Sequence, residues 1–406
     1  MSRINGKRLI ADLRRLAEFG KAGSGVNRVS FSSADIESRA WLLERFKAAG
    51  LDSAIDAVGN VRGVTARAAR AVVIGSHTDS VPMGGWLDGA MGVLYGLEIA
   101  RARIEAGRQS KLGVDVVSFQ DEEGTFLPCL GSRSFCGELT EADLAKPKSQ
   151  SGETLAQAMA RAGYPGPAWR LDRTRHVAYL EAHIEQGPRL EAANKRIGVV
   201  TGIVGIRRFR IVAHGQADHA GTTPMSMRKD AVRPLFAFAN RVHAELPAMA
   251  GADTVWNIGV MGVRPGAANV VPSQAELVVE FRDTSSDLLD RIETRLFGWV
   301  KELDAQGPAR LEIQPIARIA PTLMAQDLEE LIQAGAAECG TAAMRMPSGA
   351  GHDAMVLGHH LPSAMLFIPS IGGRSHDVAE DSAEEDIILG CEVLAAVVER
   401  LEARAA

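Results

Sequence analysis

The sequence has few cysteines, no long apolar run and no basic cluster, and each shortage excludes a class of protein. Only four of its 406 residues are cysteines and none forms a Cys-x-x-Cys pair, which argues against a disulfide scaffold. No apolar run approaches the roughly 20 residues that span a bilayer, and the first residues lack the apolar core of a signal peptide. We therefore expect a cytoplasmic protein with no membrane partner.

The composition is that of a large globular chain. With 406 residues and 46% hydrophobic content, the chain can bury a large core, and its length corresponds to two or three domains. The net charge of −5 is mild. Without a basic cluster, nucleic acid is not an expected partner.

The order of apolar segments predicts two domains of different kinds. Residues 1–206 and 317–406 alternate helical segments with short apolar strands, which predicts a layered αβα domain formed by both ends of the chain. Residues 207–316 form an insertion with a different rhythm. Its expected elements are a strand at 207–214, a helix at 228–246, strands at 254–263 and 274–282, a helix at 286–304 and a strand at 310–315.

The βαββαβ order of the insertion is typical of a ferredoxin-like α+β domain. The edge strands of such a sheet, or an exposed helix face, need cover, and a second copy of the chain can provide it. We therefore expect a homodimer formed through the inserted domain.

Polar side chains with metal-ligand spacing follow two of the short apolar runs. His77 and Asp79 come directly after the first run, Asp88 follows eleven residues beyond His77, and Glu122 and Glu123 come after the second run. Each group leads into glycines, as where a buried parallel strand delivers side chains to a cleft at its carboxyl end. The spacing therefore predicts one cleft lined by all of them.

These residue types suit a pair of divalent ions. Imidazole and carboxylate groups bind zinc at about 2.0 to 2.2 Å, and Asp88 can use both oxygens to bridge two ions. Asp79 can accept the second ring N–H of His77. Adjacent glutamates point in different directions, so Glu123 can bind metal while Glu122 transfers protons. The alternative is a solvated acidic loop, and the combination of residues favours the metal site.

Two more histidines, His183 and His376, are candidate ligands. Each follows an apolar run and lies beside glycines. Either one alone is more often a hydrogen-bonded structural histidine. Counted with His77, Asp88 and Glu123, they complete two sets of three ligands that share the aspartate.

Several long and rare strings extend this pattern over nearly the whole chain. They are Asp56-Ala-Val-Gly-Asn60, Gly75-Ser-His77-Thr-Asp79-Ser-Val, His183-Ile-Glu-Gln-Gly-Pro188, His219-Ala-Gly-Thr-Thr-Pro-Met225, Asn269-Val-Val-Pro272, Arg282-Asp283, Ser348-Gly-Ala-Gly-His352-Asp353-Ala and Ser375-His376. On these strings the chain resembles the M20 amidohydrolase family, in its branch of N-carbamoyl-L-amino acid hydrolases, allantoate amidohydrolases and β-ureidopropionases.

The resemblance implies a role for each matched residue. It implies one ion held by His77, Asp88 and His183, a second held by Asp88, Glu123 and His376, and Glu122 as the general base. A residue matching His219 would hold the scissile carbonyl, and residues matching Asn269 and Arg282 would hold the substrate carboxylate, while Gln186 and His352 match pocket positions. In related enzymes, a residue like His219 comes from the partner subunit. From the residues alone, His219 can also be read as a turn residue and Arg282 as the partner of a neighbouring acid.

The chain departs from the family pattern in two places, neither of which is a ligand. Thr125-Phe126-Leu127 follows the glutamate pair where the family often has x-Arg-Phe, which would remove a pocket cation. The common Ser-His-x-Pro-x-Glu string reads Ser375-His376-Asp377-Val378-Ala379-Glu380. Both changes concern the substrate rather than the reaction type.

The predicted reaction is hydrolysis of an N-carbamoyl-L-amino acid to the amino acid, ammonia and CO2. Allantoate is the second choice, followed by N-carbamoyl-β-alanine or another N-acyl amino acid. Water activated by two ions, for which Zn, Mn, Co or Ni suit the ligands, would lose a proton to Glu122. Trp86 and Leu87, beside Asp88, would favour an apolar substrate side chain.

Two other classes compete with this prediction. A non-catalytic metal-binding relative would be expected to have lost its base, whereas Glu122 is present. A dipeptidase or deacetylase of the same superfamily would be separated by its activity, because it would cleave dipeptides without releasing ammonia from N-carbamoyl amino acids.

Overall fold

The computed structural model describes residues 4–66, 68–107 and 111–405. They form two compact units, Met1–Thr201 with Leu323–Ala406 and Gly202–Thr322. Within the described ranges, no helix is both long and apolar enough to cross a membrane.

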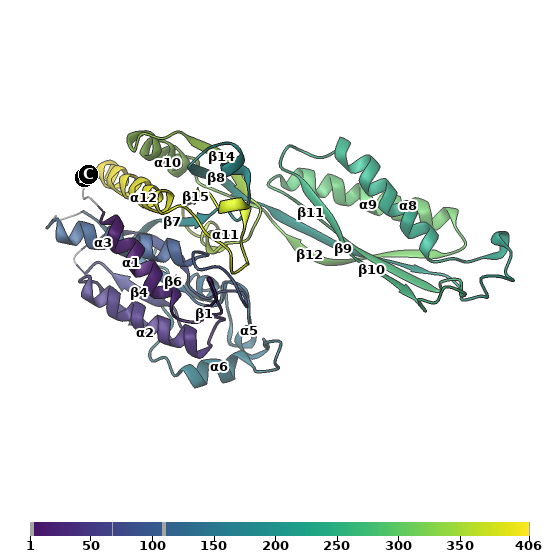
Figure 1. Ribbon diagram of the computed structural model, residues 1–406, viewed down its shortest axis with the longest axis horizontal. Helices are drawn as coiled ribbons and strands as arrows, with labels where there is room; N and C mark the ends of the chain where they lie inside the picture. The colour runs from purple at the N-terminus through teal and green to yellow at the C-terminus, as the bar shows by residue number, and fades with distance from the viewer. Residues whose placement is uncertain (1–3, 67, 108–110, 406) are drawn as a thin grey trace. The chain divides into compact units, whose positions relative to one another are not determined.

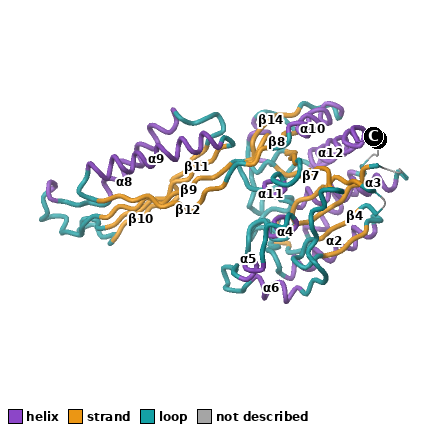
Figure 2. Tube along the Cα trace, turned by 180° about the vertical axis from the view of Figure 1, so that it is seen from behind, coloured by secondary structure: helices purple, strands orange, loops and turns teal. Residues whose placement is uncertain are grey.

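The first unit is built on a mixed sheet of nine strands (Figures 1 and 2). Its strand order is β13-β8-β15-β7-β5-β6-β4-β3, and β14 pairs with β8. The four central strands β15, β7, β5 and β6 are parallel, so their carboxyl ends share one edge. The strands are β3 (Asp52–Ile55), β4 (Val61–Val64), β5 (Arg70–His77), β6 (Leu112–Phe119), β7 (His176–Ile184), β8 (Ile197–Ile203), β13 (Thr322–Leu323), β14 (Ala343–Ser348) and β15 (Ser363–Ile368), with β1 (Lys21–Ala22) and β2 (Gly25–Val26) in a separate pair.

Helices cover both faces of this sheet, which confirms the predicted αβα layering. The helices and 3-10 turn of the unit are α1 (Gly6–Ala17), α2 (Ser33–Ala48), α3 (Ala90–Glu105), α4 (Leu130–Phe135), α5 (Glu141–Ala145), α6 (Leu155–Ala162), α7 (Arg189–Ala192), α10 (Gln326–Glu338), α11 (Asp353–Leu357), η3 (Ile371–Gly373) and α12 (Glu384–Ala405). Alternate apolar residues, such as Val72 and Ile74 of β5, pack with α1, α3, α10 and α12 in the main core. Because side chains alternate along a strand, His77 and His183 lie on the opposite face.

The second unit is a four-stranded antiparallel sheet with strand order β10-β11-β9-β12. Its elements are β9 (Gly205–His214), η1 (Met225–Met227), α8 (Val232–Glu245), η2 (Leu246–Ala248), β10 (Val255–Arg264), β11 (Gln274–Asp283), α9 (Ser286–Gln306) and β12 (Arg310–Ile319). Chain order and strand order both match the predicted βαββαβ domain. The helix expected at 228–246 begins later, at Val232, and residues 228–231 between the 3-10 turn η1 and this helix are not helical.

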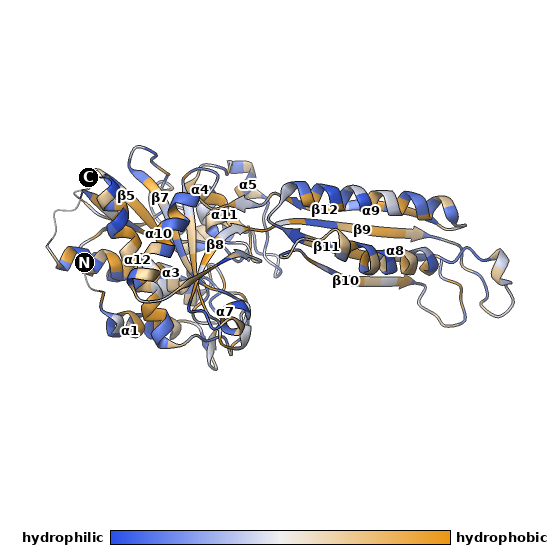
Figure 3. Cartoon of the chain, turned by 90° about the horizontal axis from the view of Figure 1, so that it is seen from above, coloured by the Kyte–Doolittle hydropathy of each residue, from blue (hydrophilic) through white to orange (hydrophobic). Residues whose placement is uncertain are grey.

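One face of the second sheet is packed and the other is not. Along β11, Leu277, Val279 and Phe281 are buried against α8 and α9, while Glu280 and Arg282 between them are partly exposed. Along α9, Leu289, Ile292, Leu296 and Trp299 are buried in the same core, and Figure 3 shows blue hydrophilic residues along this helix. The exposed face therefore carries charged residues such as Arg282.

Candidate active site

Three of the predicted site segments meet where the parallel strands of the first unit end. His77 is the last residue of β5 and pairs with Phe119, the last residue of β6. His183 lies near the end of β7 and pairs with Phe367 near the end of β15. This edge therefore also receives the segments that follow β6 and β15, which carry Glu122, Glu123 and His376.

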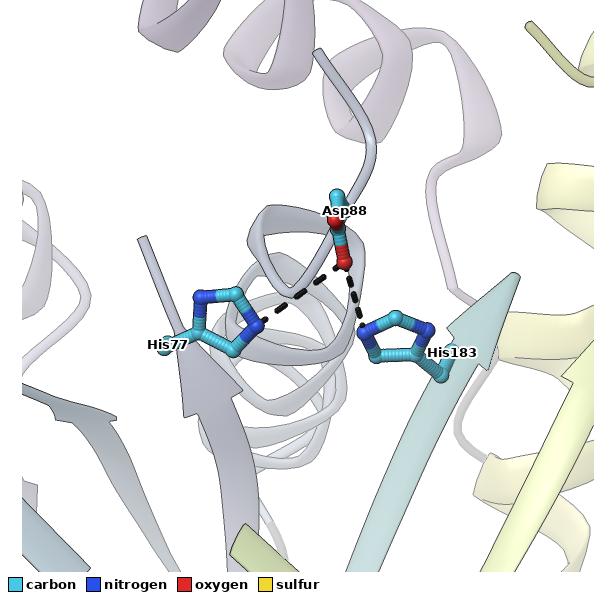
Figure 4. Close-up of side chains that lie close together, drawn as sticks. All are labelled: His77, Asp88 and His183. Carbon is cyan, nitrogen blue, oxygen red and sulfur yellow. Dashed lines mark ion pairs between the residues drawn. The ribbon is translucent and has the colours of Figure 1, made fainter. Parts of the chain in front are cut away.

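Asp88 lies at the centre of the site, with its two oxygens facing different ligands. Its Oδ1 lies 3.9 Å from His77 Nε2 and 3.0 Å from His183 Nε2 (Figure 4). Its Oδ2 lies 3.3 Å from His376 Nε2, and that nitrogen lies 3.7 Å from Glu123 Oε1. The structure thus gathers the five predicted ligands around one carboxylate.

Three groups of side chains have ligand atoms within 4.8 Å of one another. They are His77 with Asp88 and His183, Asp88 with Glu123 and His376, and His77 with Glu122 and Glu123. The first two groups share Asp88, as two ions bridged by one carboxylate require. His376 is the exposed member, since 52% of its side chain is accessible.

A glycine allows Asp88 to approach His77 this closely. Gly89 adopts a left-handed backbone with φ of 64° at the start of α3. A Cβ atom there would lie 2.4 Å from the His77 ring. Any other residue at this position would push the imidazole away from Asp88.

Burial is the largest influence on the pKa values in this cluster. It raises the pKa of Glu122 well above its usual value and that of Glu123 to about 10, and neighbouring carboxylates act in the same direction. Burial alone would lower the pKa of His183, but its hydrogen bond with Asp88 raises that pKa to about 9. Burial instead lowers the pKa of His77 to about 4, so only some of the imidazoles in the cluster favour the charged form.

The donor atoms fit divalent cations. Glu123 Oε1 and Asp79 Oδ1 are buried and have no hydrogen-bond partner among the described residues. A buried carboxylate oxygen without a partner is costly unless a cation or water satisfies it. Because the donors are imidazole nitrogens and carboxylate oxygens without thiolate, Zn, Mn, Co and Ni are all compatible.

Asp79 differs in one detail from the prediction. His77 Nδ1 hydrogen-bonds to the backbone carbonyl of Asp79 at 3.0 Å, whereas the carboxylate oxygen Oδ1 lies 3.7 Å away. The carboxylate instead accepts the backbone N–H of Glu123 at 3.3 Å and lies 3.9 Å from the buried Arg39. Asp79 therefore contacts two predicted ligands, His77 at the end of β5 through its carbonyl and Glu123 in the segment after β6 through its carboxylate.

The expectation that Trp86 and Leu87 contact the substrate side chain is wrong. Both side chains are buried in the main core. The indole N–H of Trp86 donates to Asp381 at 3.2 Å, and Arg14 lies over its ring. These contacts hold the loop that carries Asp88.

Gln186 and His352 lie beside the ligands. The amide nitrogen of Gln186 donates to Asp88 Oδ2 at 3.3 Å and to Ser375 Oγ at 3.0 Å. His352 is buried, with its ring 4.5 Å from the His183 ring and its Nε2 2.9 Å from Ser348 Oγ.

Several buried groups behind the ligands were missed in the sequence. Glu181 accepts hydrogen bonds from Ser76 Oγ at 2.6 Å and from the backbone of Ala354 at 2.8 Å. Arg39 donates to Asp35 at 2.8 Å in a fully buried pair. A charged residue inside an apolar segment is the sequence signal for both, but their partners lie too far along the chain to be inferred.

The remaining predicted residues belong to the second unit and lie at opposite ends of its sheet. His219 and Asn269 are neighbours, because His219 bridges to Val270 and the N–H of Ala220 donates to the carbonyl of Asn269 at 2.9 Å. Their loops leave the end of the sheet where His214 pairs with Gln274, whereas Arg282 pairs with Ile206 at the other end. Gln274 and Arg282 are eight residues apart on β11, roughly 27 Å along an antiparallel strand.

Comparison with known proteins identifies the class that this fold and site define. The chain belongs to the M20 family of metal-dependent hydrolases, since the Peptidase family M20/M25/M40 matches residues 73–400. Within this family it is a member of the hydantoinase/carbamoylase branch. The crystal structure of an amidase of that family from Burkholderia phymatum is 45% identical, with a TM-score of 0.94, and the match covers 100% of this chain and 99% of that one.

Curated relatives of this branch include enzymes named for different substrates. The N-carbamoyl-L-amino acid amidohydrolase of Geobacillus stearothermophilus is 35% identical over 403 residues, covering 96% of this chain and 97% of that protein. The allantoate amidohydrolase of Bacillus subtilis (strain 168) is 32% identical over 413 residues, covering 98% of each. The predicted family is thus confirmed, and the protein is a hydantoinase/carbamoylase family amidase.

Proposed function

We propose that the protein hydrolyses the carbamoyl C–N bond of an N-carbamoyl-L-amino acid. The position of Asp88 supports this most directly, because its two oxygens face two different ligand sets and Glu122 lies beside them. The similarity to an N-carbamoyl-L-amino acid amidohydrolase over nearly the whole chain favours this substrate. The similarity to an allantoate amidohydrolase supports allantoate as the second candidate.

Two divalent ions would complete the site. One would be held by His77, Asp88 and His183 and the other by Asp88, Glu123 and His376. When bound, such ions lower the pKa of a coordinated water and polarise a carbonyl.

Glu122 is the proton carrier in this proposal. Its Oε1 accepts only a long contact from the Cys129 thiol, at 4.0 Å, and its Oε2 lies 3.6 Å from His77 Nε2. It takes the proton of the attacking water as the water oxygen bonds to the carbamoyl carbon. It then returns the proton to the departing nitrogen as the C–N bond breaks, and the carbamic acid that remains gives ammonia and CO2.

His219 would donate a hydrogen bond to the carbonyl oxygen as negative charge develops there. Its Nδ1 accepts the backbone N–H groups of Gly221 at 3.0 Å and Thr222 at 3.2 Å. A neutral imidazole with Nδ1 as acceptor carries its proton on Nε2. The exposed Nε2–H of His219 is thus oriented as a donor, which a turn residue alone would not need.

Asn269 and Arg282 would hold the substrate carboxylate, with Gln186 and His352 near the ions. Asn269 is exposed next to His219. Arg282 donates to Glu280 at 2.7 Å, the contact that the alternative reading of this residue described. A guanidinium has a planar fork of N–H donors whose geometry matches that of a carboxylate, which is the chemical reason for this assignment.

We further propose that the active enzyme is a homodimer formed through the second unit. Arg282 and the His219 loop lie at opposite ends of the sheet, and the two ends of β11, Gln274 and Arg282, are roughly 27 Å apart, too far for one chain to hold a small substrate with both residues. Two chains would place Arg282 of one and His219 of the other at the same substrate. The exposed apolar side chains of the edge strand β10 are available for pairing: Val255, Val260, Met261 and Val263.

The metal assignment predicts different ion losses for two ligand variants. Asp88→Ala should weaken both ions, because Asp88 belongs to both ligand sets. His376→Ala should remove one ion per chain and keep the other, whose ligands lie on buried strands. Metal content after dialysis against a weak chelator tests this, and retention of two ions in Asp88→Ala would contradict the shared bridge.

A substrate panel tests the reaction. Protein loaded separately with Mn, Co or Zn is given N-carbamoyl-L-amino acids, N-carbamoyl-β-alanine, allantoate, N-formyl and N-acetyl amino acids and dipeptides. We expect ammonia and free amino acid from at least one N-carbamoyl-L-amino acid, at a kcat/KM at least about tenfold above that for allantoate, a difference of about 1.4 kcal/mol in transition-state binding. A higher kcat/KM for allantoate would establish the second candidate instead. Hydrolysis of dipeptides alone would exclude both.

A further inference from the structure

Asp88, which both proposed ligand sets share, is part of a closed ring of hydrogen bonds. The backbone N–H of Asp88 donates to Glu380 Oε1 at 3.0 Å, and Ser375 Oγ donates to Glu380 Oε2 at 2.8 Å. Gln186 Nε2 donates to Ser375 Oγ at 3.0 Å and closes the ring on Asp88 Oδ2 at 3.3 Å. The four residues come from three distant parts of the sequence, since Ser375 and Glu380 are only five residues apart, so the ring exists only in the folded chain.

Each hydrogen bond in the ring has a defined donor and acceptor. Glu380 accepts a third hydrogen bond, from the N–H of Leu87 at 3.2 Å, so both of its oxygens act as acceptors. Ser375 gives its only proton to Glu380 and therefore accepts from Gln186. The two amide protons of Gln186 are both used, one on Ser375 and one on Asp88.

The loop before Asp88 packs directly on Glu380. Glu380 is 2% exposed, and a Cβ atom on Gly85 would lie 1.9 Å from the Glu380 carboxyl carbon. Only glycine at position 85 leaves room for this contact.

The ring is connected to His376, the one histidine ligand that does not lie on a strand of the sheet. His77 and His183 belong to paired, buried strands, whereas His376 is exposed, has a φ of 55° and lies beyond the end of β15. Ser375 is its neighbour in sequence. The ring therefore fixes the segment that carries His376 against Asp88 through Oδ2, whereas His77 and His183 lie near the other oxygen, Oδ1.

We propose that Glu380, Ser375 and Gln186 are positioning residues that keep Asp88 and His376 together as ligands of the same ion. This proposal rests on the two-ion site of the proposed function but not on the identity of the substrate. It gives Gln186 a defined role beside the ions. It also explains why a carboxylate is needed at position 380, because three donors converge on it.

Glu380→Gln is the informative substitution, since it keeps the size and removes one acceptor. If the new amide oxygen accepts the two backbone N–H groups, its NH2 group faces Ser375. Ser375 must then turn its proton toward Gln186, which is also a donor there. One substitution thus places two donors face to face next to Asp88.

The test is calorimetric titration of the metal-free full-length protein with Mn2+ and, separately, Zn2+. Glu380→Gln should weaken the more weakly bound ion by about 10- to 100-fold and change the other by less than about threefold. Ser375→Ala should weaken the same ion, and the double variant should be no weaker than Glu380→Gln, because one break already opens the ring. Glu385→Gln is the matched control, because it is the same substitution at an exposed glutamate in the first turn of α12, outside the ring; both ions of this variant should bind as in wild type.

Three results would overturn the proposal: wild-type binding of both ions by Glu380→Gln, equal weakening of both ions, or losses that add in the double variant. If Glu380→Gln does not fold, judged by thermal unfolding without metal, Ser375→Ala decides alone by weakening one ion or neither. The readout is metal affinity, so an enzyme that rejects every N-carbamoyl compound would refute the proposed function and leave this test intact.

Discussion

Replacing Glu122 with glutamine is expected to lower kcat by about a hundred- to ten-thousand-fold, the usual contribution of a general acid–base group, while both ions stay bound. Glutamine keeps the size of the side chain but cannot take up and return a proton. The ligands around Asp88 are untouched, so metal binding and KM should change little. The measurements are kcat and KM for an N-carbamoyl-L-amino acid and the metal content of the same preparation.

This experiment also shows whether Glu122 acts as a base or as a metal ligand. Glu122 belongs to the group with His77 and Glu123 whose atoms could hold an ion. If Glu122 were a ligand, its replacement would lower metal content together with activity. Glu44→Gln, at an exposed glutamate paired with Lys47, is the matched control and should behave as wild type. Turnover within about tenfold of wild type with two ions bound would contradict the role as base.

The sequence predicted the fold well because its signals are local. Short apolar runs followed by glycines mark the ends of buried parallel strands, and such ends converge on one edge of a sheet. This is why His77 and Glu122, far apart in the chain, are brought to the same cleft. In the insertion, the alternation along β11 was equally readable, and the βαββαβ order followed from it.

The residues that support the predicted ligands could not be predicted from the sequence, because their positions depend on contacts between distant segments. Trp86 was expected in the pocket, yet its partner Asp381 lies almost 300 residues away and holds it in the core. Asp79 was expected to orient His77 through its carboxylate, but the backbone carbonyl lies closer. The choice between two oxygens of one residue depends on a local backbone turn that residue types do not specify.

Mixing two inactive variants should restore activity if His219 acts across the dimer. A site would then combine Glu122 of one chain with His219 of the other. In a dimer of one His219→Ala chain and one Glu122→Gln chain, one site has both groups intact and the other has neither. Random exchange makes half of the dimers mixed, so total activity should reach about a quarter of the wild-type value. Each variant alone should stay at least about a hundredfold below wild type.

A mixture that contains an Arg282 variant provides the control for this result. Arg282 lies at the end of the sheet where the chain enters and leaves the second unit, opposite the end that carries His219. If Arg282 serves the site of its own chain, mixing Arg282→Ala with Glu122→Gln should restore nothing, because every site then lacks one group. Recovery in both mixtures would mean that Arg282 also crosses the dimer. Recovery in neither would place His219 on its own chain's substrate and remove the reason for a dimeric active site.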